Sequence, residues 1–570
     1  MKFSFITRTR VIFFCILLFA IVLIAKLFLV QIVHSSDYSD RADRQYSTPS
    51  SNIFERGNIY FSHKDGQLVS AALQTTGFKV AIDPVKIIDK ELVYSELSKI
   101  ISLDHDVFLS KVNKQNDPYE EIANSLSKEQ ADVITLLKIS GLFIYKEKWR
   151  FYPGSSLAAQ SLGFVAYKGD ELAGRYGLER QYNDELSRDK NNPYINFFAE
   201  VFSNINKTLF NDEAMAGDIV TTIEPSVQNF LEKTIESVKE KYQIDSVGGI
   251  IMNPIDGSIY ALSSKPDFDL NNFSKIKTVS TFSNPLVENV YEFGSVIKPL
   301  VIAGALDAGV ITANTSYNDK GSVIVEKHTI YNFDKVGRGP GTTMQDVLTK
   351  SLNTGMVFIE QKLGKEKLRD YLLSFGIKDK TGIDLPNETS GLVSNILNSP
   401  REIEYANAAF GQGIALTPIE LVRSLASLSN GGNLVVPHLV QKIKYDNGTE
   451  KKMKYNTTPT KISKVTSEEI TRMLVNVMDK DKIGGGKLEH YSVAIKTGTA
   501  QVADSVGGGY YKDKHIHSFV GYFPAYDPKF IIFLYAINPK GVLYSIETWS
   551  DPFVEISNFL VNYYEVPPDR

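Results

Sequence analysis

The sequence predicts an α+β protein of several domains, whose C-terminal part is built on one antiparallel five-stranded sheet flanked by helices. The chain has 570 residues, enough for roughly three or four domains. A single long apolar run lies near the N-terminus. In the C-terminal part, strand-like runs at both ends enclose a helical middle. Apolar residues make up 43% and charged residues 22%, which excludes a disordered chain, a collagen-like fibre and a multi-span transporter.

The N-terminal apolar run predicts a single transmembrane anchor at residues 11–33. It holds one charge, Lys26, and a helix of this length crosses an apolar layer of about 30 Å. Residues 1–10 carry three basic side chains and no acidic one. The positive-inside rule therefore makes them a short cytoplasmic tail and places the body of the chain outside. A cleaved signal peptide is the alternative, but the run is long for one and no small-residue cleavage site ends it.

Charge and cysteine content exclude several other classes. The net charge is −4 although the first 36 residues are purely basic, so the body of the chain is acidic. It lacks the basic face that nucleic-acid binding requires. Cys15 is the single cysteine, which excludes an intrachain disulfide framework, a cysteine-ligated zinc site and an iron–sulfur cluster.

The body divides into a mixed region at 34–215 and a more regular region at 216–570. In the mixed region, 77–82 alternates like a strand, and 92–101 and 126–137 show helical spacing. In the regular region, Asp256-Gly257 between two strand-like runs predicts a hairpin. Thr417 begins a capping box with proline at the first helical position. The elements expected there are strands at 247–253, 258–263, 492–502, 518–523 and 530–537, and helices at 296–306, 417–428 and 551–564.

The pattern Ser-x-x-Lys marks a candidate nucleophile. It begins at Ser125, Ser187, Ser274 and Ser295. A serine nucleophile needs a base within hydrogen-bond reach and an oxyanion site beside it. Only Ser295 opens a long apolar helix, in which Lys298 at i+3 shares its face and the helix dipole favours negative charge. Apolar surroundings lower the pKa of such a lysine towards a working range. The alternative interpretation of Ser295 is a plain helix cap.

Two further patterns complete the candidate site. Lys-Thr-Gly occurs at Lys380, in a turn-rich loop, and at Lys496, in a strand-like run that further strands follow. We choose the second copy, because an edge strand facing the serine can pair with an extended peptide and bind its carboxylate. Between the motifs lie Ser351 and Asn353 of Ser-x-Asn, which alone would indicate a helix cap or loop. In this order we interpret Ser351 as a proton relay between Lys298 and the reacting nitrogen, and Asn353 as a holder of a substrate amide.

These motifs resemble those of the class B penicillin-binding proteins, the monofunctional, membrane-anchored peptidoglycan D,D-transpeptidases, and within them the FtsI-like group. The resemblance covers nearly the whole chain after the anchor. The chain departs from the family at Phe293, where proline is usual, at Ile495, where glycine is usual, and at 60–63, where an Asp-Arg pair is expected. The matching segments are 56–59, 150–153, 176–179, 291–299, 351–353, 410–418, 496–501 and 517–524.

The resemblance implies an N-terminal stalk or dimerisation-type module at 34–215, elongated in the family, and a serine transpeptidase domain that recognises penicillin at 216–570. It implies that Ser295 attacks the D-Ala-D-Ala bond of a stem peptide, that terminal D-alanine leaves, and that the acyl group passes to an amino group of a neighbouring stem. Backbone N–H groups of Ser295 and Thr499 would form the oxyanion hole. Lys496, Thr497 and Thr499 would hold the donor carboxylate.

The predicted site supplies nucleophile, base and electrostatics itself, so neither a metal nor an organic cofactor is expected. The expected partners are donor and acceptor stem peptides, β-lactams as inhibitors, the bacterial cytoplasmic membrane through 11–33, and a glycan polymerase with divisome or elongasome proteins, but no nucleic acid. Arg56, Arg150 and Glu179 are interpreted as structural pairs of the stalk, with activation by a partner as the alternative. The predicted site residues are catalytic Ser295, Lys298, Ser351 and Lys496, and substrate-binding Asn353, Thr497, Gly498 and Thr499.

Several alternatives stay open from the sequence. A D,D-carboxypeptidase or a β-lactam hydrolase would use the same residues, and a non-catalytic scaffold of the wall-synthesis complex would use none of them. An elongation role competes with the division role. A β-lactam sensor is disfavoured because residues 1–10 are too few for a signalling domain. A class A bifunctional enzyme is disfavoured because no polymerase-like domain precedes residue 215.

Overall fold

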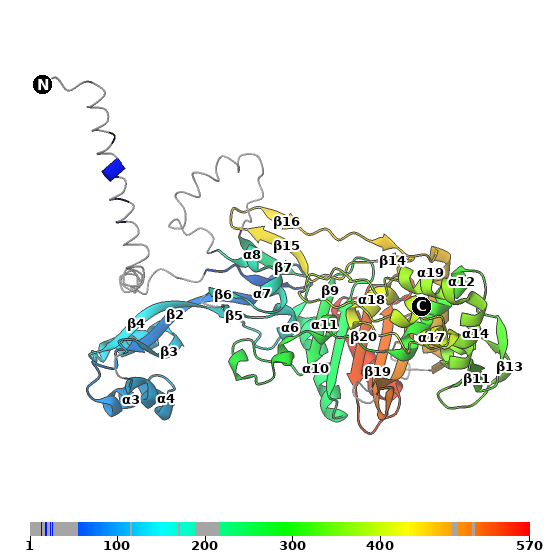
Figure 1. The fold of residues 1–570 in the computed structure, drawn as a ribbon, viewed down its shortest axis with the longest axis horizontal. Coiled ribbons are helices and arrows are strands. Elements are labelled where there is room, and N and C mark those ends of the chain that lie inside the picture. The colour runs from blue at the N-terminus through cyan, green and yellow to red at the C-terminus, as the bar shows by residue number, and fades with distance from the viewer. Residues whose placement is uncertain are drawn as a thin grey trace, which may run out of the picture. The chain divides into compact units, whose positions relative to one another are not determined.

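The fold is known from a computed structural model (Figure 1). It describes residues 55–114, 117–168, 171–188, 216–481, 488–503 and 508–570, together with positions 13, 17–19, 23 and 26. The chain divides into two compact units. One comprises Met1–Phe54 and Thr76–Trp149, and the other comprises Glu55–Thr75 and Arg150–Arg570.

The predicted anchor at 11–33 falls outside the described residues except at six isolated positions. Within the described part of the chain, no helix has both the length and the apolar character needed to cross a bilayer. The anchor therefore stays a prediction from the sequence.

The smaller unit combines strands with three short helices. Strand β2 (Leu68–Ile82) pairs with both β3 (Glu120–Leu126) and β4 (Leu142–Phe151). Side chains of Asp89, Asp104 and Ser127 accept a backbone N–H at the start of each helix and so cap it. These elements confirm the predicted strand at 77–82 and the two predicted helices. The helices are α3 (Lys90–Ser98), α4 (His105–Val112) and α5 (Lys128–Leu136), and their core includes Val80, Ile82, Val93, Leu97, Phe108, Val112 and Ile134.

The larger unit is built on the five-stranded antiparallel sheet that the sequence predicts. Its strand order is β18-β19-β20-β8-β9. The late strands join the early ones because β20 pairs with β8, and β18 is left at one edge. Gly257 closes the predicted hairpin with a φ of +85°, a conformation that suits glycine. The strands are β8 (Ser246–Met252), β9 (Ile259–Lys265), β18 (Ala494–Ala503), β19 (Tyr510–Phe523) and β20 (Phe530–Ile537).

Helices cover both faces of this sheet (Figure 1). On one face α10 (Pro225–Lys241) packs on α20 (Ser545–Tyr563), where the rings of Phe230 and Phe559 stack with centroids 4.2 Å apart. On the other face lies α12 (Lys298–Asp307), which is buried nearly all round and is accordingly apolar all round. Four helices pack around α12: α14 (Asn353–Leu363), α15 (Lys365–Ser374), α18 (Pro418–Ala426) and α19 (Lys464–Asp481). The shorter helices of the unit are α6 (Ala159–Leu162), α7 (Gly177–Gln181), α8 (Asn183–Leu186), α11 (Pro285–Glu288), α13 (Met344–Thr349), α16 (Ser394–Asn398) and α17 (Glu402–Ala408).

A second sheet of the larger unit joins segments that are far apart in the chain. Strand β1 (Ile59–Ser62) runs parallel to β7 (Gly217–Thr221), and β15 (Val440–Tyr445) pairs antiparallel with β7. Strand β1 also pairs with the beginning of β2. The remaining strands are β5 (Val165–Lys168), β6 (Glu171–Gly174), β10 (Ser316–Asp319), β11 (Ser322–Val325), β12 (His328–Tyr331), β13 (Gly339–Thr343), β14 (Asn433–Leu434), β16 (Glu450–Lys452) and β17 (Thr458–Pro459).

Arg56, Arg150 and Glu179 form a buried ion-pair cluster in this unit. The Nε atoms of Arg56 and Arg150 donate to the two carboxylate oxygens of Glu179, each at 2.6 Å. Burial acts to raise the pKa of Glu179, but the two guanidinium charges outweigh it and hold that pKa below its ordinary value. The predicted structural pairing of these three residues is therefore confirmed, and it ties three distant segments together.

Candidate active site

Ser295 lies immediately before the buried helix α12. It belongs to a 3-10 turn, Gly294–Ile297, and α12 begins at Lys298 with Pro299 in its first turn. The predicted helix at 296–306 is thus present from Lys298 onwards, whereas the preceding turn Gly294–Ile297, which carries the serine, is wound more tightly. Tyr291 holds this segment in place, because its N–H and C=O pair with the C=O and N–H of Leu416, both at 2.9 Å.

Two glycines allow the neighbouring walls to approach the serine segment. A Cβ atom on Gly411, whose φ is +83°, would lie 2.1 Å from the carbonyl oxygen of Gly294. A Cβ atom on Gly498 would lie 2.5 Å from the carbonyl oxygen of Phe293. Any other residue at these two positions would push its chain segment away from the serine. The glycine of Lys-Thr-Gly therefore brings strand β18 close to Ser295.

Lys298, Ser351, Asn353 and Lys496 form one hydrogen-bonded cluster. The Nζ atom of Lys298 donates to Ser351 O at 2.6 Å and to Asn353 Oδ1 at 2.8 Å, and it lies 3.2 Å from Ser351 Oγ. The Nζ atom of Lys496 lies 3.1 Å from the same hydroxyl. Ser351 Oγ therefore sits between two amines. No hydrogen bond joins Ser295 to Lys298 among the residues that the structure describes, so the expected direct contact is replaced by this cluster.

Burial controls the ionisation of Lys298, which has no exposed surface. Burial first, and the charge of Lys496 second, lower the pKa of Lys298 well below its ordinary value. A lysine in this setting favours its neutral form, which carries a lone pair that accepts a proton.

The backbone conformation at Ser351 orients the groups that bind Lys298 in this cluster. Ser351 has a φ of +52°, in the left-handed region that L-residues rarely adopt, and it turns the chain sharply between α13 and α14. Asn353 is the first residue of α14, and its Nδ2 donates to the carbonyl of Tyr331 at 2.9 Å. This bond leaves Oδ1 directed at Lys298. The strained turn thus places a carbonyl, a hydroxyl and an amide oxygen around one amine.

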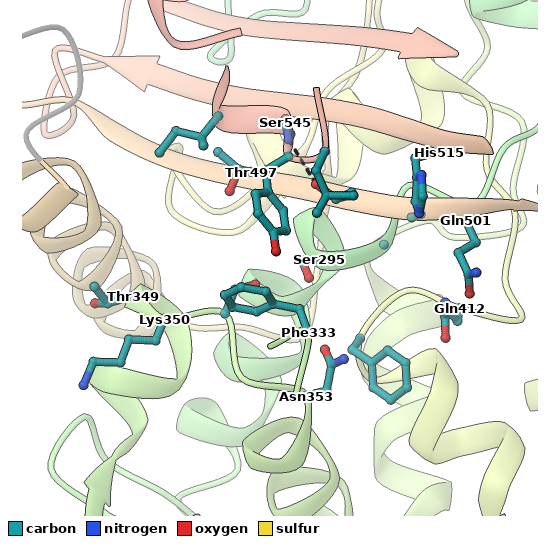
Figure 2. Close-up of a pocket in the computed structure, with 18 of the residues that line it drawn as sticks. Ser295, Phe333, Thr349, Lys350, Asn353, Gln412, Thr497, Gln501, His515 and Ser545 are labelled. Carbon is teal, nitrogen blue, oxygen red and sulfur yellow. Dashed lines mark hydrogen bonds between the residues drawn. The ribbon is translucent and has the colours of Figure 1, made fainter. Parts of the chain in front are cut away.

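A cavity of about 600 Å³ opens beside Ser295 (Figure 2). Five of the eight predicted site residues line it: Ser295, Ser351, Asn353, Thr497 and Thr499. Lys298 and Lys496 are buried and reach its wall through Ser351, whereas Gly498 packs against the serine segment. Strand β18 is tied to the start of α20 because Thr499 Oγ1 accepts the N–H of Ser545 at 3.1 Å. The structure therefore brings the three motifs together around one cavity.

Other lining residues were not predicted as site residues. Gln412 and Gln501 stand inside matching motif segments, so the motifs could have pointed to them. Phe333 and Tyr544 belong to loops that no motif marks, and their rings meet edge to face with centroids 5.6 Å apart. The unpredicted lining residues are Gly294, Phe333, Arg338, Thr349, Lys350, Phe410, Gln412, Ala500, Gln501, His515, Leu543, Tyr544, Ser545 and Ile546.

Phe293, which stands where the family usually has proline, is fully packed. Its ring lies edge to face with Phe533, with centroids 5.2 Å apart, and it also contacts Tyr535. Its carbonyl oxygen accepts from Ser518 Oγ at 3.1 Å. Aromatic pairs of this kind add to the free energy of burial. Phe293 therefore anchors the segment before Ser295 to the central sheet.

His517, in the matching segment 517–524, serves the fold. Its Nδ1 lies 2.9 Å from Thr548 Oγ1 and its Nε2 lies 3.1 Å from the carbonyl oxygen of Leu543, so both ring nitrogens have protein partners. The ring is buried, and burial lowers the pKa of His517 to about 4. The neutral ring links strand β19 to the N-terminal end of α20.

We expect acid to destabilise the protein partly through His517. The unfolded state binds this proton near pH 6.5 and the folded state only near pH 4, so stability falls as the pH drops through that window, by about 3 kcal/mol. His517→Gln should remove this part of the pH dependence, measured as the free energy of urea unfolding at pH 7 and pH 4.5. His490→Gln, which changes an exposed histidine, should keep the wild-type dependence. An unchanged pH dependence in His517→Gln would contradict the assignment.

Comparison with known proteins places the chain in a family. The penicillin binding protein transpeptidase domain matches residues 247–551, and the penicillin-binding protein dimerisation domain matches residues 54–222. The first match covers more than half of the chain. The chain therefore belongs to the penicillin-binding protein transpeptidase family, with the two-domain fold of dimerisation and transpeptidase domains.

Two curated relatives resemble nearly the whole chain. Stage V sporulation protein D of Bacillus subtilis (strain 168) is 29% identical over 96% of this chain and 84% of its own length. Peptidoglycan D,D-transpeptidase FtsI of Buchnera aphidicola subsp. Schizaphis graminum is 26% identical over 99% of this chain and 96% of its own.

Two solved structures share the fold. Penicillin binding protein 2X of Streptococcus thermophilus has a TM-score of 0.70 at 20% identity, covering 90% of this chain and 80% of its own. Penicillin binding protein 3 of Mycobacterium tuberculosis, in complex with ampicillin, has a TM-score of 0.67 at 20% identity. The match covers 90% of this chain and 96% of that protein's chain.

Proposed function

We propose that this protein is a peptidoglycan D,D-transpeptidase that cross-links stem peptides through an acyl-enzyme on Ser295. The observation that supports this most strongly is the hydroxyl of Ser351 held between the amines of Lys298 and Lys496, on the wall of the cavity that Ser295 lines. A nucleophile, a desolvated amine and a hydroxyl relay are the parts that acyl transfer requires.

Lys298 acts as the general base in this proposal. A neutral amine has two N–H groups, and Ser351 O and Asn353 Oδ1 can only accept, so they take both. The lone pair is then left for a hydroxyl. As Ser295 Oγ attacks the D-Ala-D-Ala carbonyl, its proton passes to Lys298. Ser351 then delivers a proton to the leaving nitrogen of D-alanine.

The donor peptide binds along β18. This strand is at the edge of the sheet, so its outer N–H and C=O groups can pair with an extended peptide. Lys496, Thr497 and Thr499 hold the terminal carboxylate, and the N–H groups of Ser295 and Thr499 hold the oxyanion. A β-lactam that mimics the donor acylates Ser295, which the ampicillin complex of a protein with the same fold supports.

The proposed cellular role is division. It rests on relatives named FtsI, with elongation as the alternative. In this proposal residues 1–10 are a cytoplasmic tail, 11–33 an anchor in the bacterial cytoplasmic membrane, 34–215 a stalk and dimerisation-type module, and 216–570 the transpeptidase domain outside. A membrane glycan polymerase supplies the strands, together with divisome proteins.

Mass spectrometry of the full-length chain tests the function. After exposure to a penicillin we expect a mass increase of one β-lactam, mapped to the peptide that contains Ser295. With a D-Ala-D-Ala donor and a D-amino acid we expect an exchanged product. Release of D-alanine without any transfer product would support the carboxypeptidase or hydrolase alternative. Absence of an adduct would support a scaffold.

A further inference from the structure

In the second half of the reaction an acceptor amine attacks the acyl-enzyme. The residues described above do not account for the loss of the first proton of that amine. The attacking amino group is an ammonium ion at neutral pH and must lose one proton before it can attack the acyl-enzyme. Lys298 handles the second proton, which leaves when the new amide bond forms. A second base that faces the same cavity would remove the first proton where the amine binds.

The cavity lining narrows the choice of base. Among the described residues that line it, none is aspartate or glutamate. Its titratable side chains are Arg338, Lys350, His515 and Tyr544. Of these four side-chain types, histidine is the one whose ordinary pKa lies near neutral pH.

His515 and His517 lie on the same face of β19 but differ in the hydrogen bonds that their rings make. His517 uses both ring nitrogens in hydrogen bonds with the protein. His515 is only partly buried, lines the cavity, and its ring makes no hydrogen bond with any residue of the described ranges. As far as the described ranges extend, its ring nitrogens are open to a ligand.

His515 lies at a defined end of the cavity. It stands opposite Gln501 in the β18–β19 register, and Figure 2 shows these two with Gln412 on one side of Ser295, while Thr349 and Lys350 lie on the other. The side-chain amide oxygens of the two glutamines can accept hydrogen bonds from an incoming amine. The two amide side chains at this end carry no charge, which suits a neutral amine.

From this arrangement we infer that the end of the cavity formed by Gln412, Gln501 and His515 binds the acceptor amine, and that His515 removes its first proton. The inference rests on the proposed transpeptidase function and deepens it. The ammonium gives one proton to the imidazole, which releases it to solvent. The neutral amine then forms the N–C bond and the ester C–O bond to Ser295 breaks. One of the two amine protons returns through Lys298 to Ser295 Oγ, and the other stays on the new amide nitrogen.

Partial burial favours the neutral, basic form of His515. Burial lowers its pKa, and Asp513 on the same strand opposes this. His517 on the same strand bonds to Thr548 and Leu543. Tyr544, Arg338 and Lys350 line other parts of the cavity. Glu292 accepts the hydroxyl of Tyr510, the first residue of β19, at 2.8 Å and the N–H of Gly413, which follows Gln412, at 3.1 Å.

The test compares two acceptors on the full-length chain, with a D-Ala-D-Ala donor at pH 7. Glycine arrives as an ammonium ion, whereas hydroxylamine is already neutral. In His515→Gln we expect transfer to glycine to fall about 100-fold, with a flattened pH profile between pH 5 and 8. Transfer to hydroxylamine and acylation by penicillin should stay within about twofold of the wild type. His515→Asn should behave alike, and the exposed-site control His490→Gln should change none of these rates.

Two other outcomes of the His515→Gln experiment would overturn the inference. Equal losses with both acceptors would show that His515 only positions the acceptor, and unchanged transfer to glycine would show that it plays no part. Penicillin acylation reports on folding and on the donor site in the same sample. If the wild-type chain forms no adduct on Ser295, the proposed function itself fails, which is distinct from a normal adduct with no effect of His515.

Discussion

Replacing Ser295 with alanine is expected to abolish acyl-enzyme formation, with a loss of about 10⁴-fold or more in the rate of penicillin acylation. The variant keeps the cavity and the Lys298–Ser351 cluster but lacks the hydroxyl of the turn Gly294–Ile297 that precedes α12. The measurement is the rate of covalent labelling of the full-length chain by a penicillin, followed by intact-mass spectrometry. In cells that depend on this protein, the variant should fail to support growth.

The chain provides a matched control for this change. Ser274 begins another Ser-x-x-Lys pattern, is exposed, and does not line the cavity. Ser274→Ala should therefore label at the wild-type rate. Residual labelling of Ser295→Ala on a second serine would show that the nucleophile has been misassigned, and growth supported by the unlabelled variant would favour a scaffold role.

Replacing Lys298 should slow acylation almost as much, by about 10³-fold at pH 7. Both Lys298→Met and Lys298→Arg remove a group that can accept a proton, because arginine stays protonated. In the wild type, acylation should become faster as the pH rises through the lowered pKa of Lys298 and then level off, since only the neutral amine is active. This rising limb should be missing from both variants, measured as labelling rates from pH 5 to pH 10.

The two variants together separate basicity from charge. Lys298→Arg retains a cation that can donate to Ser351 O and Asn353 Oδ1, whereas Lys298→Met retains neither. If Lys298→Arg acylated at the wild-type rate, Lys298 would act only as a positive charge, and the general base would have to be sought elsewhere. Thermal unfolding of both variants shows whether the buried cluster has survived the substitution.

The site residues that belong to motifs could be predicted because the residue types and the spacing of each motif match a chemical role. Ser295 and Lys298 lie one helical turn apart, so local spacing alone predicts that they belong together. Ser351, Asn353 and the residues around Lys496 follow from the order of the motifs along the chain. The lining residues Phe333, Arg338 and Tyr544 lie in loops, where only contacts between distant segments decide which side chains reach the cavity.

The sequence by itself determined the antiparallel five-stranded sheet, the choice of Ser295 among four similar patterns, and the choice of Lys496 over Lys380. Hydrophobic periodicity and local helix or strand character are properties of neighbouring residues, so they can be recognised in the sequence without knowledge of the fold. Only the tertiary structure decided that Lys298 bonds to Ser351 and Asn353, that residues 55–75 and 150–188 belong to the larger compact unit, and that His515 faces the cavity while His517 does not. These facts depend on the packing of segments far apart in the chain, so no local pattern encodes them.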